Sequence, residues 1–103
     1  MPSSVNGEHP FQLEISEVIA EVIRGLQRQA KQEGRGEAFL FAVKKMVKRL
    51  HRNPANFGEP LYRLPVLRMQ IRCGIIRPLS VDFAICEDRP LVFLMAVKLL
   101  SAT

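Results

Sequence analysis

The chain has 103 residues, of which 48% are hydrophobic and 24% are charged, and its formal net charge is +5. This length fits one domain with a modest core, and the composition excludes a wholly disordered chain. The longest apolar run, Leu91 to Val97, is far shorter than the roughly 20 residues of a membrane-spanning helix. The first residues lack a basic region followed by an apolar stretch, so we expect no secretory signal, no membrane partner and a cytoplasmic protein.

The N-terminal residues are polar and contain Pro2, Gly7 and Pro10. We therefore expect a flexible tail over residues 1–10, followed by a single domain over residues 11–103. Residues 11–15 alternate between apolar and polar side chains, which predicts a short strand. Ser16 has a side chain suited to the N-cap of the helix that follows.

Two helices are predicted next, each with one apolar stripe. The first ends at Gly34-Arg35-Gly36 and the second runs from Glu37 to Arg52, where Asn53-Pro54 stops it. Their short connection predicts an antiparallel hairpin. The stripe of the first helix is Val18, Ile19, Val22, Ile23, Leu26 and Ala30, and that of the second is Phe39, Leu40, Val43, Met46, Val47 and Leu50.

Residues 53–60 are predicted to form a loop, after which the pattern alternates with a period of two. Leu67 to Ile75 reads as a half-buried strand whose outer face carries Arg68 and Arg72. Residues 79–85 form a second strand, and 91–97, apolar throughout, a central strand covered on both faces. The predicted fold class is α+β: an N-terminal strand, an α-helical hairpin and a three-stranded antiparallel meander, with the helices packed on one sheet face.

Cys73 and Cys86 lie in apolar strand-like segments, so we interpret them as buried reduced thiols, with a cross-strand disulfide as the alternative in an oxidising compartment. The two cysteines and two histidines are scattered without zinc-type spacing. We therefore expect neither a metal site nor another cofactor. The methionines Met46, Met69 and Met95 are expected in the core, whereas Phe41 falls off the helical stripe and could mark a contact with a partner helix.

Positive charge is concentrated in the middle of the chain. Residues 37–77 carry nine basic and two acidic side chains, whereas the flanking segments each have a net charge of −1. Such a block predicts one positive surface that attracts nucleic acid or an acidic protein. The candidate binding residues are Arg63, Arg68, Arg72, Arg77, Lys98, Lys44, Lys45 and Lys48.

The chain resembles the RelE/ParE superfamily of toxins from bacterial toxin–antitoxin and plasmid-stabilisation systems, over roughly residues 11–98. The similarity lies in the element order and in three segments: Leu50-His51-Arg52-Asn53-Pro54, Gly58-Glu59-Pro60-Leu61, and the strand pair from Val81 to Val97 joined by an acidic turn. RelE-like members cut messenger RNA on the ribosome, ParE-like members poison DNA gyrase, and both are neutralised by a small antitoxin. The resemblance implies an acidic antitoxin partner and RNA, the ribosome or gyrase as a target.

The resemblance also gives roles to basic residues: Arg77 matches a family arginine, Arg63, Arg68 and Arg72 fall among the strand cations, and Lys98 matches the basic position that ends the last strand. The chain departs from the ribonucleases in its last residues, 98–103, which offer one lysine and no aromatic side chain. Arginine binds phosphate well but is a poor general base, and His51 reads as a helix-end residue. The catalytic residues are therefore unidentified, and three readings stay open: a toxin or inactive descendant, a non-catalytic nucleic-acid-binding module, and a homo-oligomeric structural protein.

Overall fold

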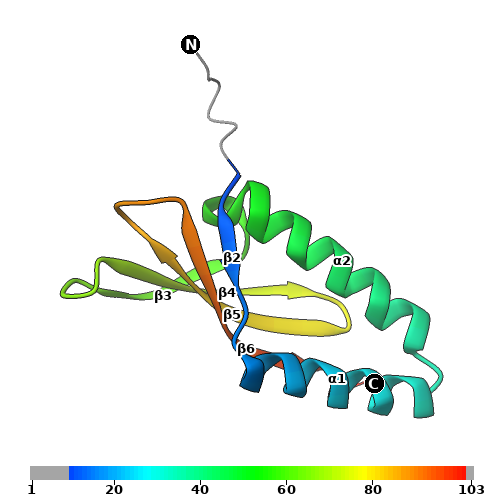
Figure 1. The fold of residues 1–103 in the computed structure, drawn as a ribbon. Helices are drawn as coiled ribbons and strands as arrows, with labels where there is room; N and C mark the ends of the chain where they lie inside the picture. The colour runs from blue at the N-terminus through cyan, green and yellow to red at the C-terminus, as the bar shows by residue number, and fades with distance from the viewer. Residues whose placement is uncertain (1–9, 102–103) are drawn as a thin grey trace.

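The computed structural model describes residues 10–101, which form two helices, one 3-10 turn and a five-stranded sheet (Figure 1). The predicted flexible tail lies outside the described residues except for Pro10. The elements in chain order are β2 (Gln12–Glu14), α1 (Glu17–Gln32), α2 (Gly36–Arg52), η1 (Pro54–Asn56), β3 (Glu59–Leu64), β4 (Met69–Ile76), β5 (Leu79–Cys86) and β6 (Leu91–Leu99).

The strand order in the sheet is β2-β6-β5-β4-β3. Strands β3 to β6 form an antiparallel meander, and β2 lies parallel to β6, with Gln12 opposite Leu91. The predicted α+β class is confirmed, but the meander has four strands rather than three. The missing strand, β3, begins within the segment predicted as a loop. It is an edge strand with five of its six residues exposed, so its sequence carries no alternation between buried and exposed positions.

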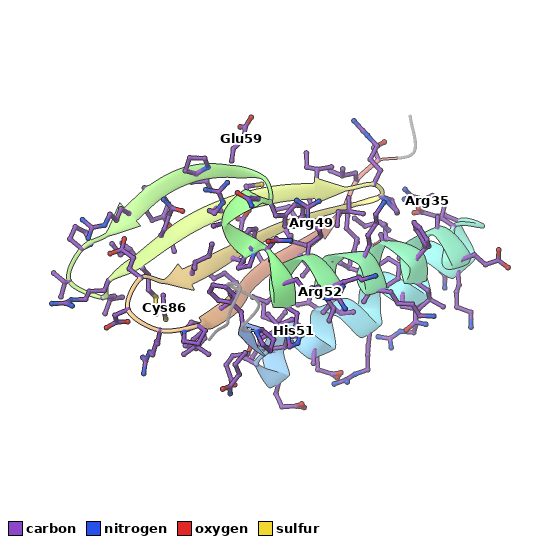
Figure 2. The ribbon with its side chains drawn as sticks, turned by 90° about the horizontal axis from the view of Figure 1, so that it is seen from above. Arg35, Arg49, His51, Arg52, Glu59 and Cys86 are labelled. Atoms are coloured by element: carbon purple, nitrogen blue, oxygen red, sulfur yellow. The ribbon has the colours of Figure 1, made fainter. Side chains whose placement is uncertain are left out.

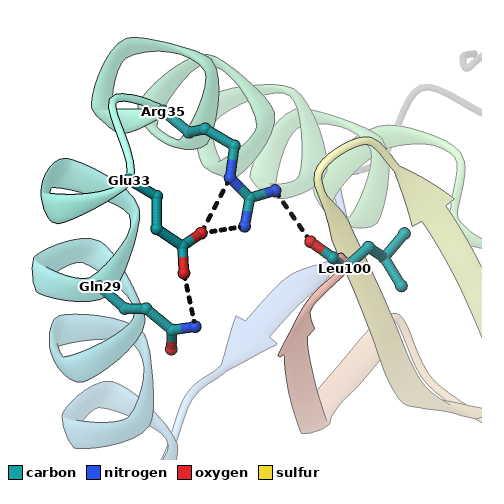
Figure 3. A network of polar contacts seen from close by, with 4 residues as sticks. All are labelled: Gln29, Glu33, Arg35 and Leu100. Atoms are coloured by element: carbon teal, nitrogen blue, oxygen red, sulfur yellow. Dashed lines mark hydrogen bonds and ion pairs between the residues drawn. The ribbon is translucent and has the colours of Figure 1, made fainter. Parts of the chain in front are cut away.

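The helix ends agree with the capping chemistry of the sequence. The backbone N–H of Ile19 donates to Ser16 Oγ at 3.2 Å, which confirms Ser16 as the N-cap of α1. The turn between the helices is held by Arg35, which donates from Nη1 to the carbonyl oxygen of Leu100 at 2.8 Å and also binds the Glu33 carboxylate (Figure 3). Gln29 donates to the other oxygen of that carboxylate at 3.2 Å. This network joins the helical hairpin to the C-terminal end of the sheet.

The core lies between the helices and one face of the sheet. Alternate residues of β5, from Leu79 to Ile85, point into it, and so do Val92, Leu94 and Val97 of β6. From the helices it receives Ala30, Phe39, Ala42, Met46 and Leu50. Phe39 and Met46 are fully buried, as their place on the predicted stripe requires.

Strand β4 faces the opposite way from the prediction. Its register pairs Ile71 with Ala84 and Cys73 with Asp82, which are the β5 residues that alternate with the core residues. Met69, Ile71, Cys73 and Ile75 therefore lie on the sheet face away from the helices, and Arg72 lies on the helix side, where it is only 8% exposed. The predicted basic outer face of this strand is wrong, because alternation defines two faces but does not say which one the helices cover.

The sheet face away from the helices is covered by no element of residues 10–101. Strand β6 is central in the sheet, but the expectation that both its faces are covered is wrong. Met95 is the extra residue of a β-bulge opposite Asp82 and Phe83, and it is 44% exposed on this face rather than in the core. Met46 is buried and Met69 is half-buried. We call this side of the sheet the open face.

Candidate functional site

The outer surface of α2 carries three lysines around an exposed aromatic ring. Lys44, Lys45 and Lys48 are exposed, and Phe41 is 65% exposed, as its position off the apolar stripe suggested. These four residues line an open hollow of about 330 Å³. Lys45 Nζ lies 5.5 Å from the centre of the Phe41 ring, within the range of a cation–π contact. We call these four residues the lysine ridge.

The lysines of the ridge have no carboxylate partner within residues 10–101. The ion pairs of this part of the chain join Arg24 to Glu17 and Glu21, Arg35 to Glu33, and Arg63 to Glu87. Three neighbouring ammonium groups without local neutralisation produce a positive potential that attracts anions and weakens as salt is added. The ridge therefore has the electrostatics of a binding surface.

The next basic residue of α2, Arg49, is engaged with the loop that follows the helix. Its Cζ lies 5.0 Å from the centre of the Phe57 ring, and its Nη2 donates to the carbonyl oxygen of Asn56 at 3.1 Å. The Phe57 ring in turn stacks on Phe83 in the core, with ring centres 5.5 Å apart. Beyond Arg49 the last turn of α2 presents exposed His51 and Arg52 (Figure 2).

Arg72 is held inside the structure by hydrogen bonds to the same loop. Its Nε donates to the carbonyl oxygen of Phe57 at 3.0 Å and its Nη2 to that of Gly58 at 2.8 Å. Its Nη1 donates to Gln70 Oε1 at 3.2 Å. A guanidinium satisfied in this way fixes the path of residues 57–58 across the sheet, and it is turned away from the solvent that an incoming phosphate would occupy.

Arg63 is exposed on β3 but is already paired. Its guanidinium holds both oxygens of the Glu87 carboxylate, with Nη2 donating to Oε1 at 2.7 Å. The hydrogen bonds and charge of Arg63 lower the pKa of Glu87 below that of an ordinary glutamate. Arg68 lies in the neighbouring β3–β4 turn with a left-handed φ of 52°, and the backbone N–H of Glu87 donates to its carbonyl oxygen at 2.8 Å.

The remaining candidates lie at the other end of the sheet. Arg77 is exposed in the β4–β5 turn, and Lys98 is exposed on β6 opposite Ser80. The eight residues of β4 separate this end from Arg68, a span of about 26 Å at the usual rise of a strand. The predicted residues therefore fall into four places: the ridge lysines together, Arg63 and Arg68 at one end of the sheet, Arg77 and Lys98 at the other, and Arg72 buried on the helix side of β4.

The thiols of Cys73 and Cys86 are both free, in agreement with the prediction of reduced cysteines. Cys86 is buried, whereas Cys73 is half-buried on the open face with its Sγ 3.7 Å from Ser80 Oγ. Burial raises the pKa of the Cys73 thiol, and the neighbouring Asp82 carboxylate raises it further. This environment favours the thiol over the reactive thiolate.

Sequence reasoning missed the open face as a feature of the molecule. It carries an apolar hollow of about 240 Å³ and no charged lining residue. The sequence features that could have indicated this face are the alternating apolar residues of β4 and the apolar run of β6. Both sets of residues were assigned to the core. The hollow is lined by Leu64, Leu67, Met69, Ile71, Ala84, Phe93 and Met95.

Comparisons of this chain with protein-family models, with curated proteins and with solved structures found no match. Neither helix within residues 10–101 has the length and apolar character needed to cross a membrane. The same residues contain no group of three or more histidine, cysteine, aspartate or glutamate side chains that could hold a metal ion.

Proposed function

We propose that this chain is a RelE/ParE-like protein that acts by binding an acidic protein segment, of the antitoxin kind, through the lysine ridge of α2. The observation that carries this proposal is the cluster of Lys44, Lys45 and Lys48 around exposed Phe41, without a carboxylate partner in the described part of the chain. The α+β class and the order of strand, helical hairpin and antiparallel strands support the resemblance on which the toxin-like reading rests.

An acidic polypeptide suits the ridge because the surface is both cationic and apolar. Leu40 and Phe41 are exposed next to the lysines, and Val47 is exposed about two turns beyond Leu40 along the helix. An acidic amphipathic segment would place carboxylates on the lysines and an apolar side chain against Phe41. Lysine and aromatic side chains on a helix provide these two contacts from one rigid element.

Binding, rather than cleavage of RNA, is the activity that the strand cations favour. Arg72 uses its donors on backbone carbonyls and Arg63 uses its donors on Glu87, so neither is poised to stabilise a phosphate transition state. His51, the one histidine of the described residues, lies in the last turn of α2, as the sequence suggested, and not among the strand arginines. The proposed function therefore needs no general base.

The test is fluorescence anisotropy with two labelled probes: an acidic peptide in which leucines are spaced at helical intervals, and a single-stranded RNA of equal charge. We expect the wild type to bind the peptide with an affinity that falls as salt rises. Lys44→Glu/Lys48→Glu should weaken peptide binding by at least about tenfold, since each reversal replaces an attraction with a repulsion. Arg77→Glu/Lys98→Glu makes the same charge change at a distant site and should retain most of the binding.

Loss of peptide binding in the Arg77/Lys98 variant, with retention in the ridge variant, would contradict the proposal. The variant Phe41→Ser distinguishes an amphipathic acidic partner from a purely acidic one. It should weaken binding of the leucine-containing peptide more than binding of a polyglutamate peptide of equal charge. Growth of cells after induction of the wild type and of the ridge variant then tests the toxin-like reading, since arrest should require the lysines.

A second candidate function, binding to nucleic acid, is favoured by the same lysines and by the single aromatic ring among them. It predicts that the RNA probe binds more tightly than either peptide and that the slope of log affinity against log salt falls when each lysine is removed. One ring offers little base stacking compared with surfaces built for single strands. The protein partner is therefore the first candidate.

A further inference from the structure

The basic face of α2 continues beyond the lysine ridge into the last turn of the helix. His51 follows Lys48 by three positions and Lys44 by seven, and Arg52 follows Lys48 by four. Residues at these spacings lie on the same side of a helix. His51 and Arg52 are both exposed (Figure 2). The axial distance from Lys44 to His51 is about 10 Å, so a segment bound along the ridge for three helical turns reaches the histidine.

The imidazole of His51 is free to contact a partner. No hydrogen bond or ion pair joins its ring to another side chain within residues 10–101. The carbonyl oxygen of His51 accepts a hydrogen bond from the backbone N–H of Phe11 at 2.7 Å. This bond joins the end of α2 to the residue before β2. The backbone of His51 is therefore fixed in place, while its side chain stays at the surface.

The acidic residues on the elements that pack against α2 are paired or lie on the far side of the sheet. The elements in closest contact with α2 are α1, η1, β2, β4 and β5. The two acidic residues of α1, Glu17 and Glu21, are both paired with Arg24. Glu14 of β2 and Asp82 of β5 lie on the open face. Neither η1 nor β4 contains an acidic side chain, so none of these elements supplies a carboxylate to the ring of His51.

The positive charges beside His51 come from its own helix. Lys48 lies one turn before it and Arg52 is the next residue, whereas Arg49 is engaged with the loop after the helix. On β4, Arg72 is buried and bound to loop carbonyls. The basic residues of α1 are paired with its own carboxylates or lie nearer the start of α2: Arg24, Arg28 and Lys31. A proton gained by His51 therefore adds to a positive surface that is open to a partner.

We infer that His51 is a further binding residue of this surface, and that it makes the affinity for an acidic segment rise as the pH falls. Histidine is the side chain that changes its charge between about pH 8 and pH 5, whereas lysine and arginine stay protonated there. The carboxylates of a partner remain largely ionised down to about pH 5. A partner carboxylate beside the ring favours the protonated imidazole, and by linkage the bound proton strengthens binding of the partner in return. The inference rests on the proposed function and adds a regulation of the same site.

The test is fluorescence anisotropy with the leucine-containing acidic peptide at about pH 8 and about pH 5.5, at constant ionic strength. We expect the dissociation constant of the wild type to be at least about threefold lower at the acidic pH. His51→Gln should match the wild type at the alkaline pH and lose this gain, and His51→Lys should bind tightly at both pH values. Arg52→Gln, the matched control, removes a permanent charge from the next exposed position. It should weaken binding by the same factor at both pH values and keep the pH dependence.

Peptide binding with the same pH dependence in the wild type and in His51→Gln overturns the inference and leaves the proposed function standing. Absence of peptide binding at both pH values overturns the inference together with the proposed function. Isothermal titration calorimetry at about pH 6.5, in two buffers that differ in ionisation enthalpy, counts the protons taken up on binding. We expect the wild type to take up part of a proton per complex and His51→Gln to take up less. Equal proton uptake by the two proteins contradicts a role for His51 in binding.

Discussion

Arg72 donates a hydrogen bond from Nη2 to the carbonyl oxygen of Gly58 at 2.8 Å, and a second from Nε to the carbonyl of the preceding residue. Arg72 was predicted to be part of a basic surface, but its side chain is buried and links β4 to the loop after α2 through hydrogen bonds. Its positive charge interacts with backbone carbonyl groups of the same chain and is not available to a binding partner.

Arg72→Met should lower the free energy of unfolding by about 2–3 kcal/mol, because it leaves two carbonyls without their charged donor. Urea denaturation followed by circular dichroism measures the change. Arg77→Met, at an exposed turn position, is the matched control and should stay within about 0.5 kcal/mol of wild type. Equal losses in the two variants would show that Arg72 has no special structural role.

Alanine substitutions at Gly58 and Gly34 distinguish the free-energy cost of a steric clash from that of a left-handed backbone conformation. Both have left-handed φ angles, 71° and 74°. A Cβ on Gly58 would lie 2.1 Å from the carbonyl oxygen of Cys73, whereas a Cβ on Gly34 meets nothing within 4 Å. Gly34→Ala should therefore cost about 1 kcal/mol, and Gly58→Ala at least about 2 kcal/mol more, since β3 must move away from β4. Similar thermal unfolding midpoints for the two variants would contradict this difference.

Phe39 and Phe41 lie two residues apart on α2, but truncating them should have different effects on the stability of the protein. Phe39 is 1% exposed in the core, so Phe39→Ala should cost about 3–5 kcal/mol. Phe41→Ala loses an exposed ring and one contact with Lys45, which is worth about 0.5–1 kcal/mol. Chemical denaturation measures stability, and the acidic-peptide probe measures binding. A large loss of stability in Phe41→Ala would remove Phe41 from the binding surface and place it in the core.

The pair of Arg63 and Glu87 gives stability a defined pH dependence. The pKa of Glu87 is lowered in the folded state, so the pair stabilises the fold above the pKa of an ordinary, unfolded glutamate. That contribution disappears as pH falls through the lowered pKa of the folded state. NMR titration of its side-chain carboxyl carbon should show Glu87 titrating at a lower pH in the folded protein than in the unfolded chain. Arg63→Gln should move Glu87 back toward the ordinary range, and an unchanged titration would show that the pair does not form in solution.

Cys73 should react slowly with iodoacetamide in the native protein, because burial raises its pKa and leaves little thiolate near neutral pH. Raising the pH should increase the native rate, and unfolding in urea should bring both cysteines to the rate of a free thiol. Asp82→Asn removes the nearby carboxylate and should increase the reaction rate of Cys73. A native rate equal to that of the unfolded chain would contradict the buried environment.

The sequence was sufficient for those parts of the fold in which one face of an element is buried and the other is wet. The Ser16 cap, the strand over residues 79–85 and most positions of the helical stripes follow from such patterns. Four residues of the predicted stripes are exposed instead: Val18, Val22, Leu40 and Val47. Edge strand β3 could not be predicted in the same way, because its side chains are exposed on both faces and leave no pattern. The orientation of β4 was also out of reach, since it depends on Arg72 finding two loop carbonyls that come from a distant part of the chain.

The candidate binding residues also differ in how far the sequence could predict their positions. The ridge lysines are four or fewer positions apart on one helix, and helical periodicity alone brings them together. The strand cations were grouped because they follow one another in the sequence, but the length of β4 and the partners of Arg63 and Arg72 keep them apart. Burial of Ile71 on the open face depends on neighbouring strands, so no local pattern separates it from a core residue.

The parallel pairing of β2 with β6 has a consequence for the biosynthesis of the protein. Gln12 takes Leu91 as its register partner, 79 positions further along the chain. During translation β2 therefore emerges long before β6, its partner among the strands of residues 10–101, and it cannot be placed in the sheet until β6 has left the ribosome. The helical hairpin can form while synthesis continues, because its contacts are local. The pairing of β2 with β6, which completes the sheet of residues 10–101, is then a late event in folding.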